Sequence, residues 1–120
     1  MAMKYMLMLI RDDEQWESLS DEDRDYDAIG GWFMKLAGDG VLVGGEELHP
    51  ARTATTVSWR EGESFVTDGP YAETKETIGG YGIVDVADLD QAIAIARTWP
   101  ARGHRVEVRA CIDHSQHGQR

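Results

Sequence analysis

The chain has 120 residues, enough for one domain with its own hydrophobic core, and 42% of them are hydrophobic. Its 22 acidic and 12 basic residues give a net charge of −10 at pH 7, with no basic block. Nucleic acids and anionic membranes attract basic proteins, so we expect neither as a partner. The one cysteine, Cys111, excludes an internal disulfide and is typical of a soluble cytoplasmic protein.

The first part of the chain predicts a buried strand followed by a helix. Residues 3–10 are apolar at nearly every position, which is typical of a strand buried on both faces and too short to cross a bilayer. Ser20 is a good N-cap before an acidic first turn, and apolar residues then recur at helical spacing as far as Gly38. We therefore expect one helix between Ser20 and Gly38.

Glycines in the next segment leave two interpretations open. Gly30 and Gly31 lie within the expected helix, where each costs about 1 kcal/mol relative to alanine. They indicate either close packing of the helix on the sheet or a gap that admits a ligand or a partner backbone. Residues 41–48 predict a second strand, with a bulge at Gly44 and Gly45.

The middle of the chain predicts a hairpin and a further strand. Residues 53–59 and 64–67 are rich in β-branched and aromatic residues and flank a turn at Glu61-Gly62. A polar stretch then runs to Thr77, and residues 81–86 form the next expected strand.

The last third predicts a helix and a final strand. Asp88 is the expected N-cap, Gln91 completes a box-like arrangement, and Pro100 ends the helix. Residues 105–110 alternate between apolar and charged, which favours a strand. The helical apolar stripe that we expect to face the sheet consists of Leu89, Ala92, Ile93 and Ala96.

These elements predict an α+β domain of the ferredoxin-like βαββαβ type with an extra β-hairpin. Both helices would then cover one face of an antiparallel sheet. We expect this domain to occupy residues 1–112, followed by a polar tail at 113–120. Because the first strand is apolar on both faces, the uncovered sheet face predicts a homodimer, sheet against sheet.

Residues 65–81 read F-V-T-D-G-P-Y-A-E-T-K-E-T-I-G-G-Y and resemble the D-G-P-F branch of the YCII-related family, with Tyr71 in place of the usual phenylalanine. The segments at 3–10, 40–50, 88–93 and 106–109 are also similar to that branch. The resemblance implies a ferredoxin-like fold paired into a dimeric α/β barrel. It implies no settled activity, although some members occur beside extracytoplasmic-function sigma factors. A His–Asp pair suggested for the YCII branch is not carried over, because no histidine precedes His49.

The loop that carries this signature supplies the candidate site. Asp68 and Lys75 are the candidate catalytic residues, because a carboxylate beside an ammonium group can tune an acid or a base. Glu73 and Glu76 are candidate ligand-binding residues of the same loop. In the structural alternative, Asp68 closes an Asx turn and the glutamates only neutralise Lys75.

Other candidate ligand-binding residues are Tyr71 and Tyr81, which could stack on a flat ligand or belong to the core or the dimer interface. His49 is the best candidate for a general base, or else a surface loop residue. His114 and His117 lack a third ligand, so we expect no metal, and no nucleotide motif implies a cofactor.

Two functions remain open. The first is a domain, enzymatic or not, that binds an unknown small molecule in a pocket beside the loop at 68–76. The second is a regulatory or interaction module that catalyses no reaction. The family resemblance suggests a sigma factor as its partner. A polar pocket favours the first, and a solid core with an apolar outer patch favours the second.

Overall fold

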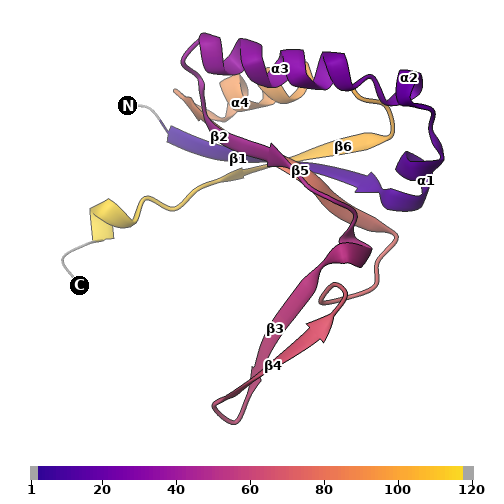
Figure 1. Ribbon diagram of the computed structural model, residues 1–120. Helices are drawn as coiled ribbons and strands as arrows, with labels where there is room; N and C mark the ends of the chain where they lie inside the picture. The colour runs from indigo at the N-terminus through magenta and orange to yellow at the C-terminus, as the bar shows by residue number, and fades with distance from the viewer. Residues whose placement is uncertain (1–2, 118–120) are drawn as a thin grey trace.

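The computed structural model describes residues 3–117, in which two helices cover one face of a four-stranded antiparallel sheet (Figure 1). The tail expected at 113–120 therefore lies partly outside the described residues. In chain order the elements are β1 (Met3–Asp12), α1 (Asp13–Ser18), α2 (Asp21–Arg24), α3 (Tyr26–Gly38), β2 (Leu42–Glu47), the 3-10 helix η1 (Ala51–Thr53), β3 (Thr55–Arg60), β4 (Glu63–Asp68), β5 (Glu76–Val86), α4 (Leu89–Ala96), β6 (His104–Ala110) and the 3-10 helix η2 (His114–His117).

The sheet confirms the ferredoxin-like α+β fold. Its strand order is β2-β5-β1-β6, and every neighbouring pair is antiparallel. The strands β3 and β4 form the predicted extra hairpin as a separate two-stranded sheet, joined by a turn in which Glu61 and Gly62 both have positive φ. The four-stranded sheet of the described chain is open and closes no barrel.

The core lies between the sheet and the helices α3 and α4. Leu7, Leu9 and Val84 are fully buried, and Leu36 and Ala92 approach them from the helix side. Alternate residues of β1 thus face the helices, because side chains of a strand alternate between its two faces. On the opposite face, Met6 and Ile10 are partly exposed and Met8 is 7% exposed.

The helix expected between Ser20 and Gly38 is interrupted. Ser20 caps only α2, and Asp25 then adopts a left-handed conformation, with φ of 51°, that ends α2 and caps α3 through a hydrogen bond from Ala28 N–H. The helix α1 was not predicted at all. Its N-cap is Asp12, which accepts a hydrogen bond from Gln15 N–H, and its buried residue is Trp16. Acidic residues thus cap the starts of α1 and α3, and Ser20 caps the start of α2 between them.

Other differences concern strand bounds and the stripe of α4. The strand β5 begins at Glu76, within the stretch expected to be a polar loop, because Glu76 and Thr77 pair with the end of β1. The bulge of β2 lies at Val43 rather than at Gly44 and Gly45. Leu89 does not face the sheet: it begins α4 and is 48% exposed. The side chains that pack on the core are Ala92, Ile95, Ala96 and Trp99, a stripe rotated away from Leu89.

Gly30 and Gly31 lie on the exposed side of α3, so close packing on the sheet is not their role in one copy of the chain. A Cβ added at either glycine would meet no atom within 4 Å. Gly45 of β2 is the opposite case, since a Cβ there would lie 2.6 Å from the carbonyl oxygen of Tyr81.

We predict that alanine at Gly30 and alanine at Gly45 change the free energy of unfolding in opposite directions. Gly30→Ala should raise the free energy of unfolding by up to about 1 kcal/mol, because alanine favours a helix and meets no obstacle. Gly45→Ala should lower it by roughly 1–3 kcal/mol, because backbone must shift. Urea unfolding measures both. Destabilisation by Gly30→Ala would contradict the expectation and indicate that another chain covers this side of α3.

Candidate functional site

A buried arginine lies where β1 meets α1. Arg11 is 4% exposed and points toward the helices, in line with the core residues Leu7 and Leu9. Its Nε lies 3.1 Å from Asp13 Oδ1, its Nη1 lies 3.6 Å from Glu47 Oε2, and its Nη2 donates to the carbonyl oxygen of Leu48 at 3.1 Å. All three nitrogens of the guanidinium group contact a protein oxygen. Arg11 is therefore a positioning residue, which holds Asp13, Glu47 and Leu48 in place.

Asp13 extends the contact of Arg11 to two further segments. Its Oδ2 accepts hydrogen bonds from Ala51 N–H at 2.8 Å and from Thr77 Oγ1 at 3.0 Å. Burial raises the pKa of Asp13, but the hydrogen bonds from Ala51, Arg11 and Thr77 together outweigh it and leave the pKa below its ordinary value of 3.8. The Arg11–Asp13 pair therefore ties the end of β1 to the segment 48–51 and to the start of β5.

A glycine makes room for the guanidinium group. A Cβ at Gly79 would lie 2.5 Å from Arg11 Nε and 2.7 Å from its Cζ. On another side of Arg11, its Cζ lies 5.2 Å from the ring centroid of Trp16, a cation–π contact. Arg11 is thus held between the backbone of β5 and an aromatic ring.

Two hollows lie on either side of the segment that Arg11 and Asp13 hold. The inner hollow, about 400 Å³, is lined by Arg11, Trp16, Arg24, Tyr26 and Glu47, among others. The outer groove, about 760 Å³, is lined mainly by apolar side chains, among them Ile10, Tyr71 and Ile78. Leu48, His49 and Pro50 line both hollows and form the wall between them.

Three of the candidate residues lie together at the outer groove. His49, Tyr71 and Glu76 all line it, and Tyr71 is 93% exposed. Glu76 also forms an ion pair with Arg105 of β6. Sequence reasoning thus identified part of one hollow, and these three assignments remain predictions.

The structure places the other candidates elsewhere. Asp68 is exposed at the end of β4 and lines neither hollow, and Glu73 is exposed in the following loop. Lys75 was expected beside the carboxylate of Asp68, but its Nζ lies 3.9 Å from Asp12 Oδ2 and its side chain is 86% exposed. Tyr81 lies half-buried on the sheet face away from the helices, beside Met8. Their functional assignments stay predictions.

His104 lies behind the inner hollow. Its ring centroid is 5.0 Å from that of Trp16 and 5.3 Å from that of Trp99. Burial lowers the pKa of His104 and the charge of Arg11 lowers it further, against the opposing effect of the carbonyl oxygen of Arg102. His104 is therefore held mainly in its neutral form as part of the aromatic layer.

Sequence reasoning missed Arg11, Asp13 and Trp16. A signal was present, because Arg11 continues the alternate spacing of the buried residues Leu7 and Leu9. A cation in line with a buried face predicts a nearby carboxylate, and Asp13 follows two residues later. Among residues 3–117, the structure holds no group of three or more His, Cys, Asp or Glu side chains arranged for a metal, and no helix there is long and apolar enough to span a bilayer.

The family model of the YCII-related domain matches residues 3–113. The chain belongs to the YCII-related family. An uncharacterised protein of Rhizobium meliloti (strain 1021) is 33% identical over 100 residues, which cover 79% of this chain and 78% of the relative. The match includes all the segments that build the two hollows, so the YCII-related domain itself carries the Arg11–Asp13 pair in this chain.

We predict that Asp13→Asn lowers the free energy of unfolding by on the order of 3 kcal/mol, because the buried guanidinium group of Arg11 then keeps only the more distant carboxylate of Glu47 as a charged partner. The matched control is Asp39→Asn, which removes an exposed ion pair with Lys35 on α3 and should cost less than about 0.5 kcal/mol. Urea unfolding at neutral pH measures both variants. Equal effects of the two substitutions would contradict a special role for the buried pair.

The difference in the free energy of unfolding between the wild type and Asp13→Asn should depend on pH. A carboxyl group whose pKa is lower in the folded state stabilises the fold above its unfolded pKa, 3.8 for Asp13, and loses this effect as the pH falls through the folded pKa. The difference should therefore be constant at neutral pH and shrink below about pH 3.8. A difference that stayed constant in acid would show that Asp13 acts without its charge.

Proposed function

We propose that this YCII-related domain binds a small molecule at the two hollows that flank the segment 48–50. The observation that carries the proposal is the shared wall, in which Leu48, His49 and Pro50 line both hollows. The buried Arg11–Asp13 pair fixes this wall through the carbonyl oxygen of Leu48 and the N–H of Ala51. A preformed wall lowers the entropic cost of binding, which favours a ligand site over a plain loop.

The linings of the hollows indicate the chemistry of the ligand. The outer groove offers Ile10, Tyr71 and Ile78, which suit a flat, apolar group. The inner hollow offers guanidinium and carboxylate groups that already neutralise one another, such as Arg11 with Glu47. We therefore propose a ligand with an aromatic ring and a neutral polar end.

Acid–base chemistry at this site would use His49. It lies at the wall between the hollows, and an imidazole nitrogen can accept a proton as a general base. Catalysis by Asp68 and Lys75 stays a separate proposal, in which Lys75 works from the hollow of about 600 Å³ that it lines with Asp12, Gln15 and Glu76.

The test of ligand binding uses benzamide and benzoate, a neutral and an anionic probe of the same shape. Benzamide should shift the backbone amide resonances of Leu48 and His49 and of residues 71–78 in two-dimensional NMR spectra, and benzoate should bind more weakly. Tyr71→Ala should weaken benzamide binding roughly tenfold, because it removes an aromatic contact. Ile112→Ala is the control, since Ile112 is 71% exposed and lines neither hollow. Shifts confined to other regions would refute the site.

We also propose that the protein works as a homodimer through the sheet face away from the helices. Met6, Ile83 and Tyr81 lie on this face and are only half-buried in one copy. Apolar side chains on one continuous sheet face favour a second copy as cover.

Light scattering at micromolar concentration should give twice the mass of 13.4 kDa. Ile83→Glu should shift the mass toward one copy, because it buries a charge in the interface. Met34→Glu makes the same change on the outer side of α3, where Met34 is 76% exposed, and should leave the mass unchanged. A wild-type mass near 13.4 kDa would exclude this dimer.

The second function, a non-catalytic interaction module, is favoured by the large exposed side chains of the β3–β4 hairpin, among them Trp59, which is 71% exposed. A sigma factor is the partner that the family resemblance suggests. Failure of both aromatic probes together with tight binding of a protein partner would favour this function over the first.

A further inference from the structure

The β3–β4 hairpin has one apolar face. Val57 pairs with Val66 and Trp59 pairs with Ser64, so these side chains share a face, because directly paired residues of two strands point to the same side. We call Val57, Trp59 and Val66 the arm face. They are 46%, 71% and 67% exposed in one copy of the chain.

The opposite face of the hairpin differs in chemistry. Ser58 and Thr67 lie there, and the one aromatic residue of that face, Phe65, is covered by the Arg60 guanidinium group at 5.2 Å from its ring centroid. The hairpin is therefore amphipathic, with a face suited to water and a face suited to burial. A two-stranded hairpin alone is marginally stable in water, so the arm face needs a cover.

The surface area of the chain indicates that the cover is another chain. One copy exposes 8535 Å², about 2,000 Å² more than the roughly 6,500 Å² expected of a compact monomer of this mass. The radius of gyration is 16.6 Å, against about 14 Å for a compact domain of this length. Stable homodimers commonly bury on the order of 1,000–2,500 Å² of each partner. The excess therefore matches the area of one dimer interface.

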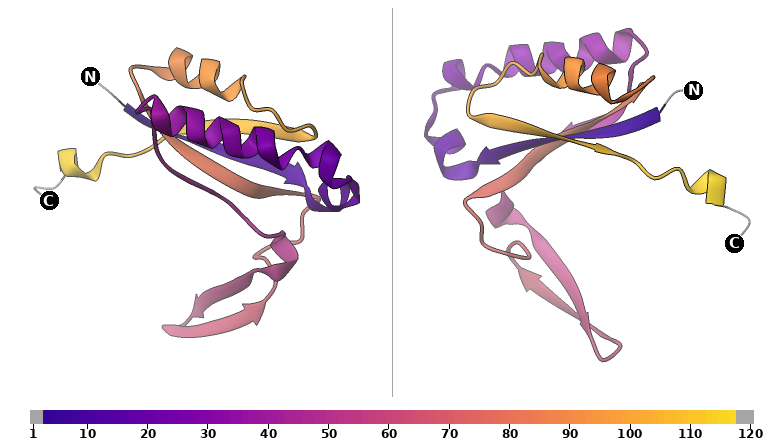
Figure 2. Two further views of the ribbon diagram at one scale, coloured as in Figure 1. Left: turned by 45° about the horizontal axis from the view of Figure 1, so that its top comes forward. Right: turned by 180° about the vertical axis from the view of Figure 1, so that it is seen from behind.

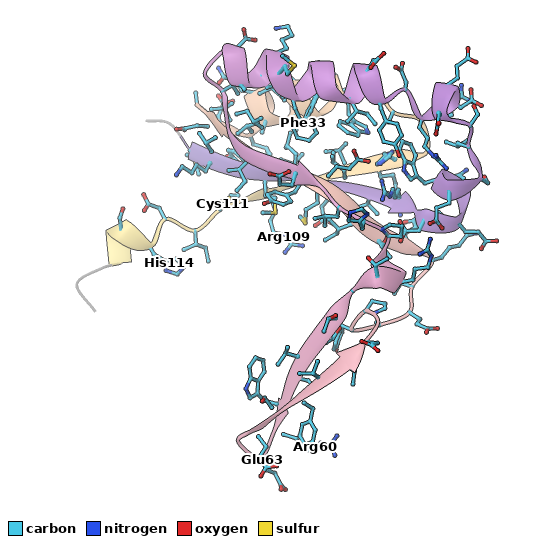
Figure 3. All side chains as sticks on the ribbon, viewed as in Figure 1. Phe33, Arg60, Glu63, Arg109, Cys111 and His114 are labelled. Carbon is cyan, nitrogen blue, oxygen red and sulfur yellow. The ribbon has the colours of Figure 1, made fainter. Side chains whose placement is uncertain are left out.

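The direction in which the hairpin extends indicates that the covering chain is a second copy of this chain. It extends on the side of the sheet away from α3 and α4 in all three views, and the labelled Arg60 and Glu63 mark its end (Figures 2 and 3). Arg109 of β6 also points to that side (Figure 3). Six residues of β3 span about 20 Å, whereas two packed sheets lie about 10 Å apart. A second copy seated on the sheet face would therefore lie beside the hairpin along much of its length.

We propose that the arm face packs against a second copy of this chain. The inference rests on the homodimer proposed above and adds a second contact, separate from the sheet face. Val57, Trp59 and Val66 then lose their exposure to water on association, and each copy holds the other with its hairpin.

Trp59 reports this contact directly. Trp16 and Trp32 are 5% and 8% exposed, whereas Trp59 is largely exposed in one copy. The fluorescence of Trp59 is obtained as the difference between the wild type and Trp59→Phe, at a concentration where light scattering shows a dimer. Acrylamide should quench this difference signal much less than it quenches free N-acetyltryptophanamide.

Two matched variants of the hairpin test how much the arm face contributes to the stability of the dimer. Trp59→Ser should raise the dissociation constant of the dimer roughly tenfold or more, because a tryptophan side chain buried in an interface contributes strongly to its free energy of association. Phe65→Ser removes an aromatic residue from the opposite face of the same hairpin and should change the constant less than about threefold. Circular dichroism confirms that each variant keeps the fold.

The outcomes separate this inference from the proposals above. A dimer in which Trp59 is quenched like the free indole overturns the arm contact and leaves the sheet-face dimer intact. A monomer overturns both. A protected Trp59 in a monomer also overturns the contact, since the arm face would then pack on its own chain. Ligand binding at the segment 48–50 is measured independently of all three.

Discussion

The arrangement of the site depends on one buried cation. Arg11 ends the central strand β1 within the core, where an unpaired guanidinium group would be costly. Asp13, Glu47 and the carbonyl oxygen of Leu48 compensate it, and they come from two separate parts of the chain. Satisfying this charge therefore also fixes where β2 ends and where the following segment runs. The hollows on both sides of that segment are therefore lined by residues that these contacts hold in place.

The loop 69–75, which follows Asp68 and carries the family signature, is positioned by the Arg11–Asp13 pair as well. Thr77 donates to Asp13, so the first residues of β5 are held at the end of β1, and the loop 69–75 that leads into β5 must end at that point. This arrangement places Tyr71 and Pro70 across from His49 and Pro50. The segment around His49 and the Asp-Gly-Pro-Tyr loop are distant in sequence. They line one groove because Asp13 Oδ2 accepts hydrogen bonds both from Ala51, just after the first segment, and from Thr77, just after the loop.

Much of the fold follows from local patterns in the sequence, whereas the site does not. The alternation of β6, the cap at Asp88 and the turn at Glu61-Gly62 are local signals, and each predicted its element. The break at Asp25 was missed because its left-handed backbone is not distinguished from helix by apolar spacing. The Arg11–Leu48 contact joins residues 37 positions apart, and no local pattern reports it. The loop at 68–76 stood out by composition, but only three-dimensional contacts show that its Lys75 faces Asp12.

The two edge strands of the sheet affect whether copies of the chain can add to one another without limit. Edge strands β2 and β6 have unpaired backbone groups that could recruit strands of other copies. The bulge at Val43 distorts the ladder of β2, and Glu46 and Glu47 add charge at its end. On β6, Arg105, Glu107 and Arg109 place alternating charges along the strand. Edge-to-edge growth into fibres is thereby disfavoured, whereas the contacts proposed between copies use faces, where two-fold symmetry would close the assembly at a finite size.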